Sequence, residues 1–372
     1  MAHTIRRFPW ALREEGRITM VSFPNAGKIT QDFFAEIIYP RCGAHRDEVI
    51  AGPEYGVDVS VVRMSNGYAL AVTTDPLSLI PTLGLKESAW LSVHLMASDI
   101  TTTGYPPLYA LFDLNLPPNL NSKDFEIYWN YISDFCKDLG TAIIGGHTGR
   151  FEGQNSTVVG GGTMITVGPE QDILTSKNGN PGDKVIVTRQ CALVSTAILA
   201  LSFPETIRNA CGKEILEAGQ KLFYQTSTVS AALAAVRAGR GKNGVTAMHD
   251  VTEGGVCGAL VELATASQCG IIIQRDRIPI GEAQKRICGQ FGIDPLYCVG
   301  AGSLIITVVP EKVQSVVHCL SEEGIESAVV GELVEKEKGM ILRENDQMKP
   351  LKHPGVDPYW EAFFKAFQKG WK

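Results

Sequence analysis

Three aspartates in the first half of the chain stand at the ends of predicted elements. Asp58 lies on the polar face of a predicted strand, Asp75 ends the next strand, and Asp99 falls in the last turn of a predicted helix. A carboxylate at the C-terminal end of a helix faces the negative end of the helix dipole, which costs about 0.3–1 kcal/mol. Each aspartate alone fits a solvated loop residue. Together they predict a magnesium site, because Mg²⁺ takes oxygen ligands and bridges carboxylates to phosphates.

A second candidate segment runs from His249 to Gly255, with the sequence His-Asp-Val-Thr-Glu-Gly-Gly. A strand is predicted before it and a helix after it, with Thr252 as the N-cap and Glu253 in the first turn. A glycine-lined helix start after a strand and a polar loop is typical of a phosphate site, since free backbone N–H groups bind anions there. The alternative interpretation of His249 is structural, as a hydrogen-bond donor to a neighbouring carbonyl.

A third candidate segment, Gly-Gly-His-Thr-Gly, follows a short predicted strand and comprises Gly145, Gly146, His147, Thr148 and Gly149. The glycines permit close backbone approach to a ligand, the histidine can bind metal or phosphate, and the threonine offers a hydroxyl. The alternative is a tight turn with a capping threonine. Common nucleotide motifs are absent: Ala26-Gly27-Lys28-Ile29 lacks the leading glycine and the hydroxyl of a P-loop, and no G-x-G-x-x-G follows a strand.

Composition narrows the class of protein. The 372 residues, 44% hydrophobic and 20% charged, fit two globular domains. A net charge of −6 argues against sequence-independent nucleic-acid binding. The nine cysteines form no C-x-x-C pair and indicate reduced thiols in a cytoplasmic protein. No apolar run approaches the length of a membrane span, so no membrane contact is expected.

Hydrophobic periodicity predicts two modules of mixed strands and helices in tandem, an α+β organisation. A Gly/Asn/Asp/Pro-rich stretch at 168–183 serves as the linker. We divide the chain into an N-terminal extension at 1–27, an N-terminal domain at 28–170 and a C-terminal domain at 171–372. The expected strands cover 57–61, 68–74, 108–116, 142–144, 157–167, 184–188, 245–248, 271–274, 303–309 and 327–333. The expected helices cover 31–39, 86–103, 122–139, 192–202, 226–239, 253–267, 281–291, 311–323 and 357–371.

Five segments, in order, resemble the signature of the aminoimidazole ribonucleotide (AIR) synthetase superfamily. Its members include selenophosphate synthetase, thiamine-monophosphate kinase and the hydrogenase maturation protein HypE, and the likeness is greatest to the HypE branch. It spans about Gly52 to Val334. The matching segments are His249 to Leu260, Gly56 to Ser60, Thr73 to Asp75, Ser98 to Ile100 with Gly104 and Pro106, and Gly145 to Thr148, while Gly182-Asp183 opens the second domain in the family manner.

The resemblance implies a fold and a chemistry. Members pair two N-terminal sheets across a homodimer into a β-barrel, beside a C-terminal α/β sandwich domain, with ATP in a cleft between the domains. The metal ligands would be Asp58, Asp75, Asp99 and Asp250. The catalytic set would be Asp75, Asp99 and His147, and the nucleotide would contact Asp58, Gly145, Gly146, Thr148, His249, Asp250, Glu253, Gly254 and Gly255.

Some residues depart from the family pattern. Val57 replaces the first aspartate of a pair, and His147 replaces an aspartate, which gives a softer metal ligand. The chain ends Gln368 to Lys372 without the terminal cysteine of HypE. The expected function is therefore ATP- and Mg²⁺-dependent transfer of the γ-phosphoryl group to an unidentified small-molecule or amide-type acceptor. The alternative is a nucleotide-binding partner or assembly protein, derived from a HypE-like ancestor, that has lost turnover.

Overall fold

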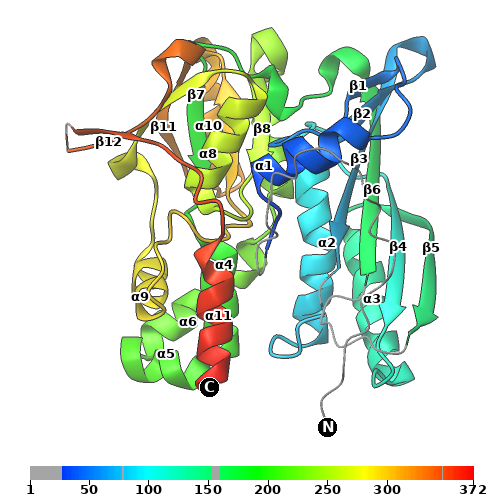
Figure 1. The fold of residues 1–372 in the computed structure, drawn as a ribbon, viewed down its shortest axis with the longest axis vertical. Coiled ribbons are helices and arrows are strands. Elements are labelled where there is room, and N and C mark those ends of the chain that lie inside the picture. Colours follow the sequence, from blue (N-terminus) through cyan, green and yellow to red (C-terminus); the bar gives the residue numbers. More distant parts are fainter. Residues whose placement is uncertain (1–26, 78, 152–159, 346) are drawn as a thin grey trace, which may run out of the picture.

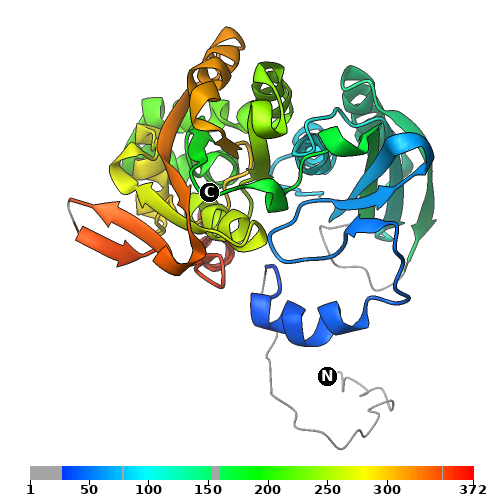
Figure 2. The ribbon, with the colours of Figure 1, turned by 90° about the horizontal axis from the view of Figure 1, so that it is seen from above.

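The computed structural model describes residues 27–77, 79–151, 160–345 and 347–372. In these ranges the chain forms a six-stranded and a seven-stranded sheet, each in its own half of the molecule (Figures 1 and 2). The predicted extension at 1–27 lies outside the described residues except for Gly27. In the described part of the chain, no helix is long and apolar enough to cross a bilayer.

The N-terminal sheet has the strand order β1-β2-β3-β6-β4-β5. Its neighbours pair antiparallel except for β4 and β5, which are parallel. The strands are β1 (Val49–Ala51), β2 (Ser60–Arg63), β3 (Tyr68–Pro76), β4 (Tyr109–Leu116), β5 (Ala142–Arg150) and β6 (Gly160–Pro169). Burial alternates along β3 and β4 because successive side chains point to opposite faces of the sheet.

Helices α2 (Leu85–Thr101) and α3 (Ser122–Asp138) cover one face of this sheet. Val93, Met96 and Ile100 of α2 pack with Phe112 and Leu114 of β4 in a buried core. Both helices begin and end within two residues of the predicted bounds, since their apolar stripes are regular. The opposite face, which carries Tyr109 and Leu111, remains partly exposed.

The C-terminal sheet has the strand order β13-β12-β9-β11-β7-β10-β8. Among the described strands of this C-terminal sheet, β9 and β12 pair parallel and all other neighbours pair antiparallel. The strands are β7 (Lys184–Thr188), β8 (Val245–Asp250), β9 (Gly270–Gln274), β10 (Leu304–Val308), β11 (Ser327–Val334), β12 (Met340–Glu344) and β13 (Gln347–Pro350). Every residue of β8 and β10 is buried; β10 is accordingly almost entirely apolar, whereas β8 ends in the buried polar residues His249 and Asp250.

Helices pack on both faces of this second sheet. α8 (Gly255–Ala266) shares a core with β7, β9 and β11, while α7 (Val229–Ala235) and α10 (Val313–Glu322) pack against the opposite face. A separate helical layer comprises α4 (Leu193–Ser202), α5 (Pro204–Cys211), α6 (Lys213–Lys221), α9 (Glu282–Gln290) and α11 (Pro358–Gln368). Leu91 of α2 inserts into that layer, so the two domains share a hydrophobic contact.

Several local predictions need correction. The Gly-Gly-His-Thr segment is neither loop nor turn: it lies inside β5. The strand predicted at 57–61 begins only at Ser60, and Asp58 lies in the loop before it. The helix predicted at 31–39 is a short α1 (Gln31–Phe33) continued by a π-helical turn, Phe34–Ile38. The sequence analysis missed β1, β12, β13, α5 and α6.

The six-stranded sheet is open, with β1 and β5 at its edges. No closed barrel forms among the described residues of this single chain. The barrel implied by the family resemblance requires the sheet of a second copy, so it remains a prediction. The predicted arrangement of two modules, each a mixed sheet with helices, is present.

Candidate functional site

Four predicted aspartates meet at one cavity between the domains. The cavity has a volume of about 710 Å³, within the usual range for small-molecule sites. Three of the aspartates come from the N-terminal domain, from the loop before β2, from β3 and from α2, and the fourth ends β8 of the C-terminal domain. We call this set the acidic group: Asp58, Asp75, Asp99 and Asp250.

Burial and mutual repulsion perturb the acidic group. Burial first, then Asp75 and Asp250, raise the pKa of Asp99 well above its usual value, although a hydrogen bond from the Thr73 hydroxyl (2.8 Å to Oδ2) opposes the shift. Burial and Asp58 raise the pKa of Asp250 to about 7. Burial also raises the pKa of Asp75. These carboxylates therefore lie where a compensating positive charge would be strongly favoured.

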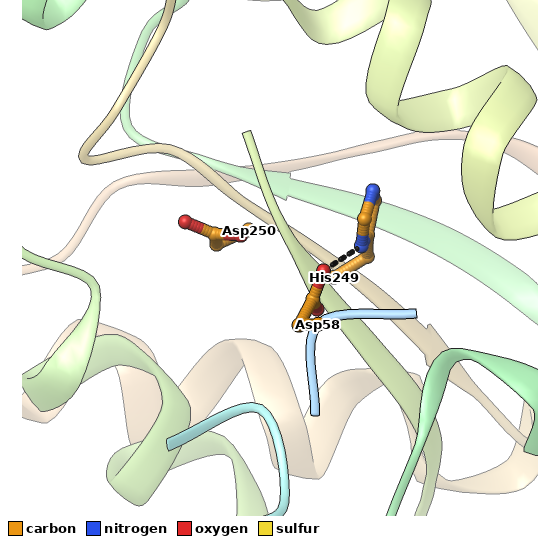
Figure 3. A group of neighbouring side chains, drawn as sticks. All are labelled: Asp58, His249 and Asp250. Carbon is orange, nitrogen blue, oxygen red and sulfur yellow. Dashed lines mark ion pairs between the residues drawn. The ribbon is translucent and has the colours of Figure 1, made fainter. Parts of the chain in front are cut away.

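His249 lies between two carboxylates, Asp58 of the N-terminal domain and Glu262 of its own domain, so its contact with Asp58 joins the two domains. Its Nδ1 lies 2.6 Å from Oδ1 of Asp58 (Figure 3). Its Nε2 lies 3.1 Å from Oε2 of Glu262 on α8. Burial alone would lower the pKa of His249, but the two carboxylates outweigh burial and raise it to about 10. The ring is therefore an imidazolium at neutral pH, with both nitrogens donating.

The same interaction lowers the pKa of Glu262 to about 2, although burial alone would raise it. All three side chains of this interdomain clamp, Asp58, His249 and Glu262, are less than a tenth exposed. His249 therefore has the structural role that was the alternative interpretation of the sequence. It donates hydrogen bonds to two carboxylates, not to the carbonyl group that this interpretation expected.

A candidate cation position lies beside this clamp. Ligand atoms of Asp58, His249 and Asp250 lie within 4.8 Å of one another (Figure 3). An imidazolium has no free lone pair, so the carboxylates are the better cation ligands. Oδ2 of Asp58 is buried and has no hydrogen-bond partner among the described residues. This oxygen is free to bind a cation or a donor.

Lys28 is a site residue that sequence reasoning missed. Its ammonium donates to the Thr252 hydroxyl (2.9 Å), and its backbone N–H donates to Oε2 of Glu253 (2.7 Å). Burial alone would lower the pKa of Lys28, but Glu262 and three members of the acidic group raise it. In the sequence, the Gly27-Lys28 pair resembles part of a P-loop but lacks the rest of the motif. Its role depends on long-range packing that no local pattern shows.

The sequence analysis also missed Glu262. It is a buried carboxylate on an otherwise apolar helix, α8. A lone acidic residue in such a helix is a signal that could have been used, because an unpaired buried charge is costly.

The start of α8 differs from the prediction. Gly254, not Thr252, precedes the first helical residue, and it adopts a positive φ of 84°. Its N–H donates to Oδ2 of Asp357 (2.8 Å), so a carboxylate of the chain already takes this donor. Glu253 accepts from the indole N–H of Trp360 (3.1 Å) and lines the cavity with Thr252. The prediction that Thr252 caps the helix is wrong.

The third candidate segment lies apart from the cavity. Gly145, Gly146, His147 and Thr148 are exposed on the edge strand β5. A Cβ on Gly146 would lie 2.0 Å from the carbonyl oxygen of Phe112, so the close approach of β4 requires this glycine. The structure thus brings together the acidic group, His249 and Glu253, and it leaves the β5 segment outside.

Two family models match this chain. The N-terminal domain of AIR synthase related proteins matches residues 56–167, and the C-terminal domain of the same family matches residues 180–342. The chain belongs to the AIR synthase-related family. The matches contain all four members of the acidic group. The resemblance noted in the sequence, including its HypE-like character, is confirmed.

Relatives with named activities fall into several branches of this family. The chain is 26% identical to a hydrogenase expression/formation protein of Methanocaldococcus jannaschii (72% of this chain, 76% of that protein). It is 26% identical to the carbamoyl dehydratase HypE of Rhizobium leguminosarum bv. viciae (66% and 67%). It is 28% identical to the selenide, water dikinase of Methanococcus maripaludis (78% and 88%).

A solved structure supports the same fold. The crystal structure of the hydrogenase maturation protein HypE in complex with ATP superposes with a TM-score of 0.62 at 18% identity. The alignment covers 89% of this chain and 94% of that protein. The two-domain AIR synthase fold with mixed sheets and helices is thus shown.

Proposed function

We propose that this chain is an ATP- and Mg²⁺-dependent phosphoryl-transfer enzyme whose nucleotide occupies the cavity between the domains. The observation that carries the proposal is the convergence of the acidic group from both domains on that cavity. Two relatives point the same way by name: one is solved as a complex with ATP, and another is a dikinase.

The residues present fit a magnesium ion. The acidic group provides only oxygen ligands. The raised pKa values of Asp75, Asp99 and Asp250 call for positive charge, and Oδ2 of Asp58 has no hydrogen-bond partner within the described ranges. Asp58, Asp75, Asp99 and Asp250 would hold the ion. When bound, Mg²⁺ supplies charge neutralisation for the phosphates, which is the main requirement of phosphoryl transfer.

Other residues of the chain serve binding and orientation. The ammonium of Lys28 offers a fixed positive charge to the phosphate end. The cavity is also lined by apolar side chains, which suit an adenine ring: Leu91, Leu95, Val194 and Ile198. The clamp of Asp58, His249 and Glu262 holds the two walls at a fixed separation, which favours productive positioning.

The exposed β5 segment enters the proposal through a homodimer. In one chain, His147 and its neighbours lie outside the cavity. We infer that a second copy covers the open face of the N-terminal sheet, as the family resemblance implies, and that Gly145, Gly146, His147 and Thr148 approach the phosphates only in that assembly.

Calorimetric titration with ATP, with and without Mg²⁺, followed by a phosphate-release assay on the same sample, tests this function. Mg²⁺-dependent binding with slow basal release is the expected result. Absence of binding would contradict it. Binding without release in the presence of candidate acceptors would favour the second candidate, a nucleotide-binding assembly partner, which the replacement of a metal-ligating aspartate by Val57 supports.

A further inference from the structure

A second, smaller cavity adjoins the large one. It has a volume of about 280 Å³ and shares Lys28, Glu253 and Glu262 with the large cavity. Its other walls come from 29–32 at the start of α1, from Tyr55, and from the loop at 353–357 that leads into α11. Figure 2 shows α1 lying across the junction of the two domains. A molecule in the small cavity would therefore border the proposed nucleotide.

The two cavities differ in their relation to the family. The acidic group lies within the residues that the family models match, 56–167 and 180–342. Most of the small cavity is built outside those ranges, by Lys28 to Asp32, Tyr55, and His353 to Asp357. The small cavity is therefore built mainly by segments that flank the matched domains, next to the proposed nucleotide site inside them.

His353 presents an unused donor in this cavity. Its Nδ1 accepts the N–H of Gly355 (3.0 Å), so the neutral ring carries its proton on Nε2. Nε2 is buried and has no hydrogen-bond partner in the described part of the chain; the nearest carboxylate oxygen, Oε1 of Glu262, is 3.8 Å away. Burial lowers the pKa of His353, which keeps the ring neutral. An unpaired buried donor costs about 1–3 kcal/mol, so an oxygen acceptor supplied by a ligand would be favoured. Nε2 packs beside Gly254 and Gly258 at the start of α8, so a ligand oxygen reaches it through a small movement of the His353 ring or of this backbone.

The charges around the cavity select against anions. Four carboxylates line it: Asp32, Glu253, Glu262 and Asp357. Among its described lining residues, Lys28 is the one permanent cation. Glu253 and Asp357 already accept backbone and indole N–H groups. A bound carboxylate or phosphate would face this excess of negative charge at short range.

We propose that the small cavity is the subsite for the second substrate, and that it takes a small uncharged or cationic molecule whose carbonyl or hydroxyl oxygen accepts a hydrogen bond from Nε2 of His353. This assignment rests on the proposed function, because it places the second substrate beside a nucleotide in the large cavity.

The test uses a matched pair of probes, acetamide and acetate, which differ mainly in charge. The full-length protein, ¹⁵N-labelled at histidine, is titrated with each probe while the ring nitrogens are observed by NMR. Saturation transfer to the probe methyl group gives a second readout. We expect acetamide to shift the His353 resonance saturably and acetate to bind at least about tenfold more weakly, a difference of roughly 1.4 kcal/mol.

His353→Asn is the diagnostic variant. The Asn carboxamide oxygen can accept the Gly355 N–H in place of Nδ1, while the Nε2 donor is deleted. The affinity for acetamide, followed by saturation transfer from the protein to its methyl group, should fall at least about tenfold. The control is His318→Asn, at an exposed histidine on α10, which should bind acetamide like the parent protein.

Either of two results overturns the assignment: no shift of His353 with acetamide, or acetate binding as tightly as acetamide. Repeating the titration with saturating MgATP separates this proposal from the previous one. Simultaneous binding of both supports the subsite. Competition between acetamide and MgATP overturns the subsite and leaves the nucleotide site intact. If MgATP does not bind at all, the proposed function is wrong. The small cavity then has no nucleotide beside it, so its assignment as a second-substrate subsite is wrong as well.

Discussion

The carboxylates of the acidic group have different local partners. Asp58 is paired with His249, and Asp99 accepts from Thr73, whereas Lys28 opposes the burial-driven rise in the pKa of Asp75. Asp75, like Asp250, belongs to neither the interdomain clamp nor the Thr73 hydrogen bond, so its replacement should cost little stability.

Asp75→Asn should weaken MgATP binding about tenfold or more, since a charge-assisted contact contributes about 1.5–3 kcal/mol. The midpoint of thermal unfolding should stay within about 2 °C of the parent, because the substitution removes repulsion rather than packing. Calorimetric titration and thermal melts measure the two effects. Asp134→Asn, at an exposed aspartate on α3, serves as the control. An unchanged affinity in Asp75→Asn would place the nucleotide elsewhere.

The protein without ligands should lose stability as the pH rises from about 6.5 to 10. The folded pKa of His249 is raised from 6.5 to about 10, so its stabilisation is complete below 6.5 and is lost as the pH rises through 10. The folded pKa of Asp250 is raised from 3.8 to about 7, so its ionisation costs stability, absent below 3.8 and complete above 7.

Both trends have the same sign above pH 6.5. Thermal melts at constant ionic strength measure the fall in the unfolding midpoint. In His249→Gln, the unfolding midpoint should fall less between pH 7 and 10 than in the parent protein, because the variant has no imidazolium to deprotonate. A parent midpoint that is constant from pH 6.5 to 10 would show that the clamp contributes nothing.

At the scale of elements, the start of α8 depends on glycine. Gly255 adopts a φ of +64°, and a Cβ there would lie 2.6 Å from the carbonyl oxygen of Leu296. We expect Gly255→Ala to destabilise the protein by about 2–4 kcal/mol through backbone strain and overlap. Urea unfolding measures the loss. Gly289→Ala, on α9 with open space around its Cα, should cause no loss; equal effects of the two would contradict the steric argument.

Elements with regular periodicity could be predicted from the sequence, and glycine-rich elements could not. The helix predicted at 86–103 is α2 (Leu85–Thr101), because its apolar positions recur at helical spacing. β5 was shortened in the prediction, since Gly145 and Gly146 resemble a turn although close pairing with β4 requires glycine. Helices α5 and α6 are amphipathic but short, and Pro204 and Gly212 interrupt the sequence beside them, so neither forms a long periodic pattern that would predict a helix.

The acidic group shows the same division within the site. Its members were recognisable by residue type and position at element ends. Their convergence depends on how the two domains pack, which no local pattern specifies. Lys28 and Glu262 were missed for this reason, since each acquires its role only from partners more than ten residues away in the chain.

At the scale of the whole molecule, one face of the N-terminal sheet lies open. Leu111 and Tyr109 of β4 are partly exposed there, while alternate residues pack under α2 and α3. We expect light scattering at micromolar concentration to give a homodimer, with Leu111→Lys producing a monomer. Lys137→Glu, at an exposed lysine of α3, should leave the dimer intact. A monomeric parent protein would remove the route by which His147 could reach the phosphates.

The site draws on segments from nearly the full length of the described chain. Lys28 contacts Thr252 and Glu253, and Asp357 binds the N–H of Gly254. During translation these partners leave the ribosome in sequence order, with an interval on the order of tens of seconds between the first and the last. Both domains can therefore collapse before the site is finished. The two cavities proposed to bind ligands would be complete only when the segment around Asp357 has emerged, so their assembly is a late event in synthesis.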